Sequence, residues 1–358
     1  MKDRIIYLST VLASIAILFI ANFFIEPTEI AESEYIRATV IEIIDIFEQE
    51  VPGGTNRYIY FYARTGQGRI VEGEQIFTTL IPESLPEVSV GDRVLLLYDT
   101  DGFYEFRGYM RTIPIYILTA IFIIAILIFG RKKGFNALLS LTLTVTCIFF
   151  IFVPGVLNGA NIRIAALLVC AYVTVSTLLI VEGFTKKGIT AIISCSLSII
   201  LTGIILITME SFLYLSGLVG SEASQIQEIV DLNSVTFAAI LIGTLGAIMD
   251  IAVSISSSLW EVSETSEKPT FKQSVTSGIN IGKDILGTML NTLVLAYIGS
   301  YLVIVLSLVH NSVISYEFFN REVIIIEFLR ILIGSIGIFI AIPIGTFVCA
   351  FAYNKKTA

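Results

Sequence analysis

Charged residues are scarce in this sequence. Asp, Glu, Lys and Arg make up 15% of the 358 residues, hydrophobic residues make up 55%, and the mean hydropathy is +0.87. Soluble domains carry about 25% charged residues, so the composition excludes an ordinary soluble protein. It indicates a membrane protein with one or more aqueous segments, for which the lipid bilayer is the first predicted partner.

Histidine and cysteine are also rare. The only histidine is His310, and no Cys or His cluster surrounds it, which argues against a histidine-based metal site. The four cysteines, which we interpret as small buried side chains, lie in apolar segments at Cys147, Cys170, Cys195 and Cys349. None lies in an aqueous segment, so no disulfide framework is encoded there. The sequence predicts no cofactor and leaves any metal ligands unknown.

Motifs of nucleotide and hydrolase chemistry are missing. The chain has no G-x-x-x-x-G-K-[ST] loop, no G-x-S-x-G elbow and no H-E-x-x-H helix. An intramembrane aspartyl protease needs two aspartates on facing helices, and Asp250 and Asp284 could meet in that way. Their surroundings, MDIAV and KDILG, do not resemble that class. We therefore predict that the protein is not an enzyme.

Long apolar runs are abundant. Eight segments have the roughly 20 residues that are needed to span a bilayer. We predict these spans at 5–25, 112–129, 135–153, 162–181, 189–209, 235–259, 285–309 and 323–353. The first follows Lys2 and Arg4 and is not followed by a clear A-x-A-like cleavage site, so we interpret residues 1–26 as an uncleaved anchor. Residues 112–358 then form a seven-helix membrane domain.

Residues 27–111 have a different character. β-rich runs at 36–47, 57–63, 69–77, 92–98 and 103–110 alternate with turn-rich pieces. Five strands in about 80 residues predict a small β-barrel of the OB or SH3-like kind between the first and second spans. Tyr58, Tyr60 and Tyr62 share one face of a strand, where we favour core or interface packing over a ligand-stacking surface.

The predicted barrel is acidic. It holds 15 acidic residues and seven arginines, which accounts for the whole formal net charge of −8. This balance argues against nucleic acid as a partner and mildly favours cationic partners.

All ten lysines fall on one side of the predicted topology. Cytoplasmic loops carry an excess of Lys and Arg, which sets the orientation. We therefore predict a multi-pass protein of the bacterial cytoplasmic membrane, with both termini in the cytoplasm and residues 27–111 outside it.

Two predicted spans carry polar stripes at helical spacing. The residues of the predicted intramembrane site are Asp250, Ser254, Ser257, Asp284, Thr288 and Asn291, with Asn280 and Thr292 on the second stripe. Glycines that would let neighbouring helices approach closely are Gly243, Gly246, Gly278 and Gly282. A carboxylate at membrane depth costs about 2.5–3.5 kcal/mol on insertion scales, which favours a bound cation, a proton or a donor. The alternative is that serine hydroxyls or backbone amides satisfy Asp250 and fix helix packing.

The last predicted span contains a pair of opposite charges. Glu327 and Arg330 are three residues apart, the spacing of an ion pair on one helical face. Pro343, with Gly345 close behind it, predicts a kink or break in this long helix. Broken helices line binding cavities in transporters, although a kink can also serve only to fit a helix to its neighbours.

Several of these segments resemble one family of membrane proteins. The blocks at 243–250, 254–257, 280–288 and 291–299, the segment EFLRILIGSIGIFIAIPIG from Glu327, RGYMR at 107–111 and VGDRV at 90–94 are similar to signature segments of the YibE/F-like proteins. The resemblance covers nearly the whole chain and implies an eight-span integral membrane protein. It implies no biochemical activity.

Two functions are therefore open. The first is an ion- or proton-coupled transporter or exporter component, whose polar stripes line the path of a small ion or polar solute. The second is a non-transporting envelope receptor or assembly protein, whose barrel binds a peptide, a polymer or a partner protein. The sequence does not determine the oligomeric state.

Overall fold

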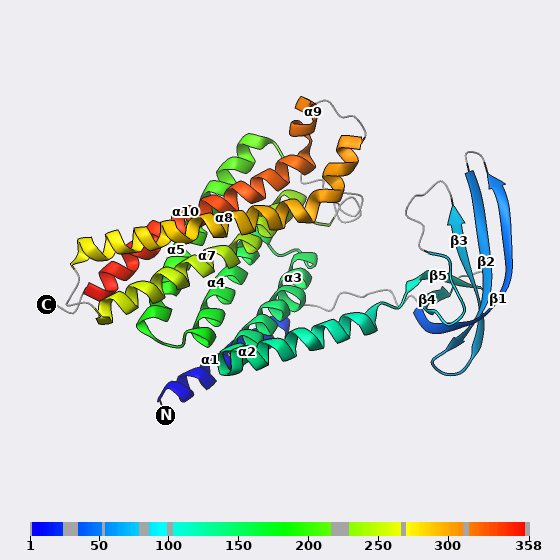
Figure 1. The fold of residues 1–358 in the computed structure, drawn as a ribbon, viewed down its shortest axis with the longest axis horizontal. Helices are drawn as coiled ribbons and strands as arrows, with labels where there is room; N and C mark the ends of the chain where they lie inside the picture. Colours follow the sequence, from blue (N-terminus) through cyan, green and yellow to red (C-terminus); the bar gives the residue numbers. More distant parts are fainter. Residues whose placement is uncertain are drawn as a thin grey trace. The chain divides into compact units, whose positions relative to one another are not determined.

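The fold is given by a computed structural model, drawn in Figure 1. It describes residues 2–23, 35–51, 54–78, 86–98, 103–215, 229–265, 270–310 and 315–354. The chain divides into two compact units. One comprises residues 29–128, and the other, called the membrane unit below, comprises residues 1–28 together with 129–358.

The smaller unit contains a five-stranded β-barrel. Its strands are β1 (Tyr35–Val51), β2 (Gly54–Thr65), β3 (Ile70–Thr78), β4 (Arg93–Tyr98) and β5 (Tyr104–Tyr109). The sheet closes in the order β1-β2-β3-β5-β4 through the pairing of β1 with β4. The pairings are antiparallel apart from that of β3 with β5. This order is that of an OB barrel rather than an SH3-like one, and the predicted small barrel is confirmed.

The barrel core is built by alternate residues of its strands. On β2 the inward side chains are those of Ile59, Phe61 and Ala63, which are 0–1% exposed. Gly73 of β3 allows the Phe61 ring to sit against the backbone, since a Cβ at Gly73 would lie 2.8 Å from that ring. The tyrosines of β2 point outward, and Tyr62 is 38% exposed. Packing in the barrel core is therefore wrong for these tyrosines, and packing at an interface stays a prediction.

Helices make up most of the remaining described chain. They are α1 (Lys2–Phe23), α2 (Thr112–Cys147), the π-helical η1 (Ile148–Phe152), α3 (Val153–Leu157), α4 (Ile162–Val181), α5 (Lys186–Leu213), α7 (Leu232–Thr265), α8 (Phe271–His310), α9 (Ser315–Asn320) and α10 (Glu322–Asn354). The barrel follows α1 and precedes the longer helices.

Six helices in the described part of the chain are long and apolar enough to cross a membrane, rather than the eight predicted. They are Thr112–Leu157, Ile162–Val181, Lys186–Leu213, Leu232–Thr265, Phe271–Ser307 and Glu322–Tyr353. The protein is therefore a multi-pass membrane protein in contact with the lipid bilayer.

Two regions account for the difference in the number of spans. Helix α1 has 22 residues, Lys2–Phe23, the length of a full crossing, and it is not among the six because its side chains are described only over Tyr7–Phe19. The predicted spans at 112–129 and 135–153 fall within one run, Thr112–Leu157, which counts once among the six. Two helices meet within this run at a kink, where Arg131 has φ 47° and ψ −122°, at the charged residues 131–133 that predict a turn.

Helix α7 is central to the packing of the membrane unit. It contacts α4, α5, α8 and α10, and its side chains Phe237, Ile248, Ile251 and Ile255 are fully buried. Figure 1 shows α8 and α10 running beside each other along this bundle. Apolar side chains on the facing helices therefore fix the positions of the polar groups described below.

Glycines allow α8 to lie close against α10. A Cβ atom at Gly278 would lie 2.7 Å from the Thr346 side chain, and one at Gly282 would collide with Ile342. The two glycines predicted on α7 have different surroundings. A Cβ at Gly243 would lie 3.0 Å from the Tyr297 hydroxyl, whereas nothing lies within 4 Å at Gly246.

Helix α10 continues through Pro343 as a single helix from Glu322 to Asn354. The predicted helix break is therefore absent. Proline removes one N–H donor and crowds the preceding turn. Within a bundle, however, neighbouring helices and local adjustments compensate for this loss. Because α10 packs against α5, α7 and α8, the surrounding contacts keep it helical.

Candidate functional site

The first polar stripe lies on the outward side of α7. The Asp250 side chain is exposed, and Ser254 and Ser257 are half-buried. Gly246, one turn earlier, faces open space. Within the described part of the chain, Asp250 has no hydrogen bond or ion pair. The carboxylate is thus available to a group from outside the single chain.

The second polar stripe also lies on an outward face, on α8. Asp284, Thr288 and Asn291 are all exposed. The Thr288 hydroxyl donates to the carbonyl of Ile285 in the same helix, at 2.9 Å. Among the described residues, no hydrogen bond or ion pair joins this stripe to Asp250. The six residues of the predicted site are therefore divided between two faces that look away from the apolar core.

A buried ion pair lies on α10. Arg330 Nη1 lies 3.0 Å from Glu327 Oε1, and the Glu327 side chain is 8% exposed. The guanidinium carbon lies 5.8 Å and 5.9 Å from the ring centroids of Tyr297 and Tyr301 on α8. The Tyr301 side chain also lies beside the Glu327 carboxylate. The two charges are thus largely buried, and two aromatic rings lie beside the guanidinium.

This cluster holds α8 against α10. Desolvation of two charges is costly, and their mutual attraction and the ring faces offset part of that cost. Within the described residues, Arg330 Nε has no hydrogen-bond partner. Sequence reasoning found the charged pair but missed Tyr297 and Tyr301. The two tyrosines are four residues apart and so share one face of α8. That spacing is the feature of the sequence from which they could have been found.

A second ion pair joins α4 to α5. Arg163 Nη2 lies 3.4 Å from Glu210 Oε2, and the Glu210 side chain is 9% exposed. The Arg163 guanidinium also lies over the Phe237 ring, 5.8 Å from its centroid. A cavity of about 430 Å³ beside it is lined by Arg163 and Asp231. Sequence reasoning missed this pair because its partners are 47 residues apart.

Comparison with known families covers the region that carries these groups. A family model described as YibE/F-like protein matches residues 118–355. The chain belongs to the YibE/F-like family. No curated protein and no solved structure matches it. The match includes both polar stripes and both ion pairs and begins after the barrel, so the resemblance is confirmed from residue 118 onward, and over residues 27–111 it stays a prediction.

Three helices of this YibE/F-like protein meet in a cluster of hydroxyls. Thr190 Oγ1, Ser256 Oγ and Tyr353 OH lie 2.6, 2.8 and 2.9 Å from one another. Ser256 also donates to the Lys187 carbonyl, at 2.7 Å. Because these groups satisfy one another, the cluster ties the helices together. It holds the start of α5 and the ends of α7 and α10 at one end of the bundle.

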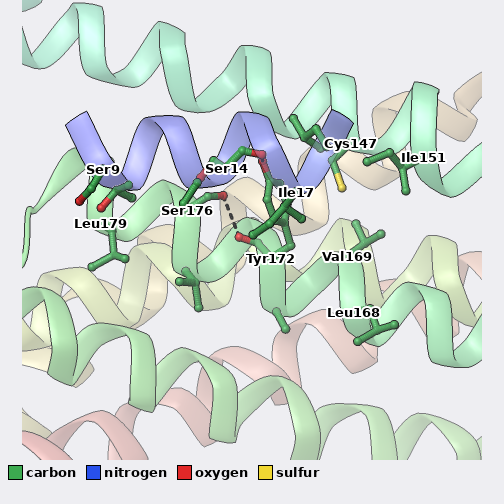
Figure 2. Close-up of a pocket in the computed structure, with 15 residues that line it drawn as sticks. Ser9, Ser14, Ile17, Cys147, Ile151, Leu168, Val169, Tyr172, Ser176 and Leu179 are labelled. Carbon is green, nitrogen blue, oxygen red and sulfur yellow. Dashed lines mark hydrogen bonds between the residues drawn. The ribbon is translucent and has the colours of Figure 1, made fainter. Parts of the chain in front are cut away.

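An apolar groove of the YibE/F-like protein lies between α1, η1 and α4, with a volume of about 800 Å³. Figure 2 shows Ser14 and Ile17 of α1 facing Val169 and Tyr172 of α4. The Ser176 hydroxyl donates to the Tyr172 carbonyl at 2.7 Å, and the Tyr172 hydroxyl to the Ser14 carbonyl at 3.4 Å. The groove therefore offers no charged group to an ion and is suited to lipid contact.

Proposed function

We propose that this YibE/F-like protein is a component of an ion- or proton-coupled transporter or exporter. The observation that carries the proposal is the Asp250 carboxylate. It lies within an apolar helix, on a face with Ser254 and Ser257, and it has no partner in the described part of the chain. Ionisable groups are rare in membrane spans because hydrocarbon cannot solvate them. Those that do occur mark ion pathways, substrate pathways or proton relays.

The chemistry of this stripe suits a small cation or a proton. Carboxylate and hydroxyl oxygens are hard ligands that replace the hydration shell of a cation, and a lone carboxylate can also accept a proton. Asp284, Thr288 and Asn291 on α8 extend the same oxygen-rich chemistry. The proposed role is transport rather than covalent catalysis, so no catalytic residue is assigned.

The proposal includes an orientation in the bacterial cytoplasmic membrane. The Tyr7 hydroxyl donates to Asn136 Oδ1 and Asn136 Nδ2 donates to the Ile180 carbonyl, each at 3.0 Å. The start of α1 thus lies at the end of α4, next to the start of α5. The hydroxyl cluster brings the ends of α7 and α10 to the same level. Lysines border all of these helix ends, which supports a cytoplasmic location for both termini and an outside location for residues 27–111.

Replacing Asp250 with asparagine tests the transport proposal. The substitution keeps the size of the side chain and removes its charge, so we expect it to abolish complementation of a deletion strain. Glu261→Gln is the matched control, because it removes a charge from the last turns of the same helix, where the side chain is exposed. Both variants should reach wild-type levels in membrane fractions. Full complementation by Asp250→Asn would contradict the proposal.

A receptor function has one specific observation in its favour, the outer surface of the barrel. Phe47, Tyr58 and Ile76 are cross-strand neighbours on β1, β2 and β3. Phe47 is 54% and Ile76 49% exposed, and the Phe47 and Tyr58 rings lie 6.2 Å apart. Exposed apolar rows of this kind mark contact surfaces.

The next cross-strand row places a tyrosine between two acids. Tyr60 pairs with Asp45 on one side and Glu74 on the other. Partial burial, followed by the charge and hydrogen bond of Glu74, raises the pKa of Tyr60. The phenol therefore remains protonated near neutral pH and donates to the carboxylate. An aromatic row beside acidic side chains is suited to a cationic peptide or protein segment.

Substitutions on this row distinguish the two functions. In the full-length protein, Phe47→Ala with Tyr58→Ala should leave a transporter active, because the membrane helices are untouched. A receptor should lose its activity with the same change. Complementation of the deletion strain is the measurement, and Ile70→Ala, which alters another exposed apolar side chain of the barrel, is the control. Loss of function in the double variant alone would favour the receptor.

A further inference from the structure

Helix α8 packs by one side only. Gly278 and Gly282 lie against α10, and Leu293 lies against Gly334 of the same helix. Asn280, Asp284, Gly287 and Asn291 lie on the opposite side and are all exposed. We call these four residues the α8 seam. No hydrogen bond or ion pair involves its polar side chains within the described residues.

The α8 seam is a poor surface for lipid. It belongs to a helix that is long and apolar enough to cross the membrane, and Asn291 lies about 11 Å further along that helix than Asp284, at 1.5 Å per residue. An amide that faces hydrocarbon leaves two donors and an acceptor without partners. Polar side chains in membrane helices normally hydrogen-bond to another helix. The seam therefore needs a protein partner.

We propose that the α8 seam is the contact between two copies of this chain, related by a two-fold axis along the membrane normal. The inference goes beyond the proposed function, since it holds whether or not the protein transports a solute. The four seam residues follow one another at intervals of four, three and four. This is the repeat with which two parallel helices keep one face in contact.

Self-complementarity identifies a second copy as the partner. In a two-fold contact the same residues meet, so each group must be able to bind its own kind. An asparagine amide has this property, because its oxygen accepts what its nitrogen donates. Gly287, where a Cβ would have nothing within 4 Å, leaves room for the second backbone between Asp284 and Asn291.

The charges of the seam also match a second copy. Two facing Asp284 carboxylates would repel each other. Lys283, however, is exposed beside Asp284, at the edge of the seam. In parallel paired helices, a side chain at the edge of one seam lies beside the central position of the other. The Lys283 ammonium of each copy can therefore reach the Asp284 carboxylate of the other, and two ion pairs replace the repulsion.

Cysteine cross-linking in native membranes tests the proposal on the full-length protein. The four native cysteines are buried and free, so we expect the wild-type protein to give no cross-linked product. Asn291→Cys places a thiol on the two-fold axis, where oxidation by copper phenanthroline should convert most of the protein to a covalent dimer. Leu168→Cys on α4, also exposed, is the control and should remain monomeric.

A second measurement covers the case in which an introduced thiol alters the packing. Asn291→Leu should weaken the dimer in mild detergent by roughly tenfold or more in dissociation constant, the factor that corresponds to about 1.4 kcal/mol. Molar mass by light scattering measures this, and the variant should still fold, because the Asn291 side chain is exposed within its own chain. The proposal is overturned if Asn291→Cys cross-links no more than Leu168→Cys, if it cross-links only to a different protein, or if the wild-type protein is monomeric by mass.

Discussion

Replacing Arg330 with methionine should destabilise the folded protein by about 3–5 kcal/mol, the cost of leaving one member of a buried ion pair without its partner. The Glu327 carboxylate would stay in a site where its side chain is 8% exposed, without an ion-pair partner among the described residues. The contacts of the guanidinium with two tyrosine rings would be lost as well. Unfolding in detergent, followed by the fluorescence of Trp260, measures the effect.

Two further variants separate charge from packing. Glu327→Gln combined with Arg330→Met removes both charges, so it should recover much of the lost stability. Arg321→Met breaks the exposed pair with Glu317, in which the side chains are 44% and 53% exposed, and should cost less than about 1 kcal/mol. If Arg330→Met cost no more than Arg321→Met, the pair would not be buried in the folded protein. Trp260 is suited to the assay because it packs against Tyr353, joining α7 to α10.

Replacing Gly282 with alanine should be the next most damaging single change. The added Cβ would collide with the Ile342 side chain and could be accommodated only by moving α8 away from α10. Overpacking of this kind costs about 1–3 kcal/mol. We expect a lower midpoint of thermal unfolding in detergent, together with a shift of α8 that weakens the contacts of Tyr297 and Tyr301 with Arg330.

Gly299→Ala on the same helix is the matched control. Nothing lies within 4 Å of a Cβ at Gly299, and alanine favours the helix by about 1 kcal/mol over glycine. This variant should be neutral or more stable. If the two alanine variants unfolded at the same temperature, close contact between α8 and α10 at Gly282 would be contradicted.

The barrel shows which part of the fold the sequence could predict. Turn residues and β-rich runs gave five strands at nearly the observed positions, because strand signals are local. The inward face of β2 could not be predicted with the same success. Tyrosines alternate there with Ile59, Phe61 and Ala63, so both faces are hydrophobic enough to be buried. The close contact of Phe61 with Gly73 selects one of them, and that contact depends on β3.

The polar stripes show a similar limit. Helical spacing correctly predicts that Asp284, Thr288 and Asn291 lie toward one side of a helix. Whether that side faces a core depends on the neighbouring helices. On α8 the glycines at 278 and 282 face α10, and residues two positions away are therefore turned outward. Gly278 and Asn280 are two residues apart, so they lie on nearly opposite sides of the helix. The sequence does not say which of the two sides meets a neighbouring helix.

The way in which the barrel closes has a consequence for how the protein is built. The first and last strands of the barrel, β1 and β5, both pair with β4, where Tyr35 lies opposite Leu97 and Tyr109 opposite Val94. Neighbouring strands are about 4.8 Å apart, so the chain enters and leaves the barrel on strands separated by about 10 Å. A domain with adjacent ends can be inserted, exchanged or lost without redirecting the rest of the chain. The family match begins at residue 118, after the barrel. The barrel is thus built in a way that would allow it to be exchanged without redirecting the helices that follow it.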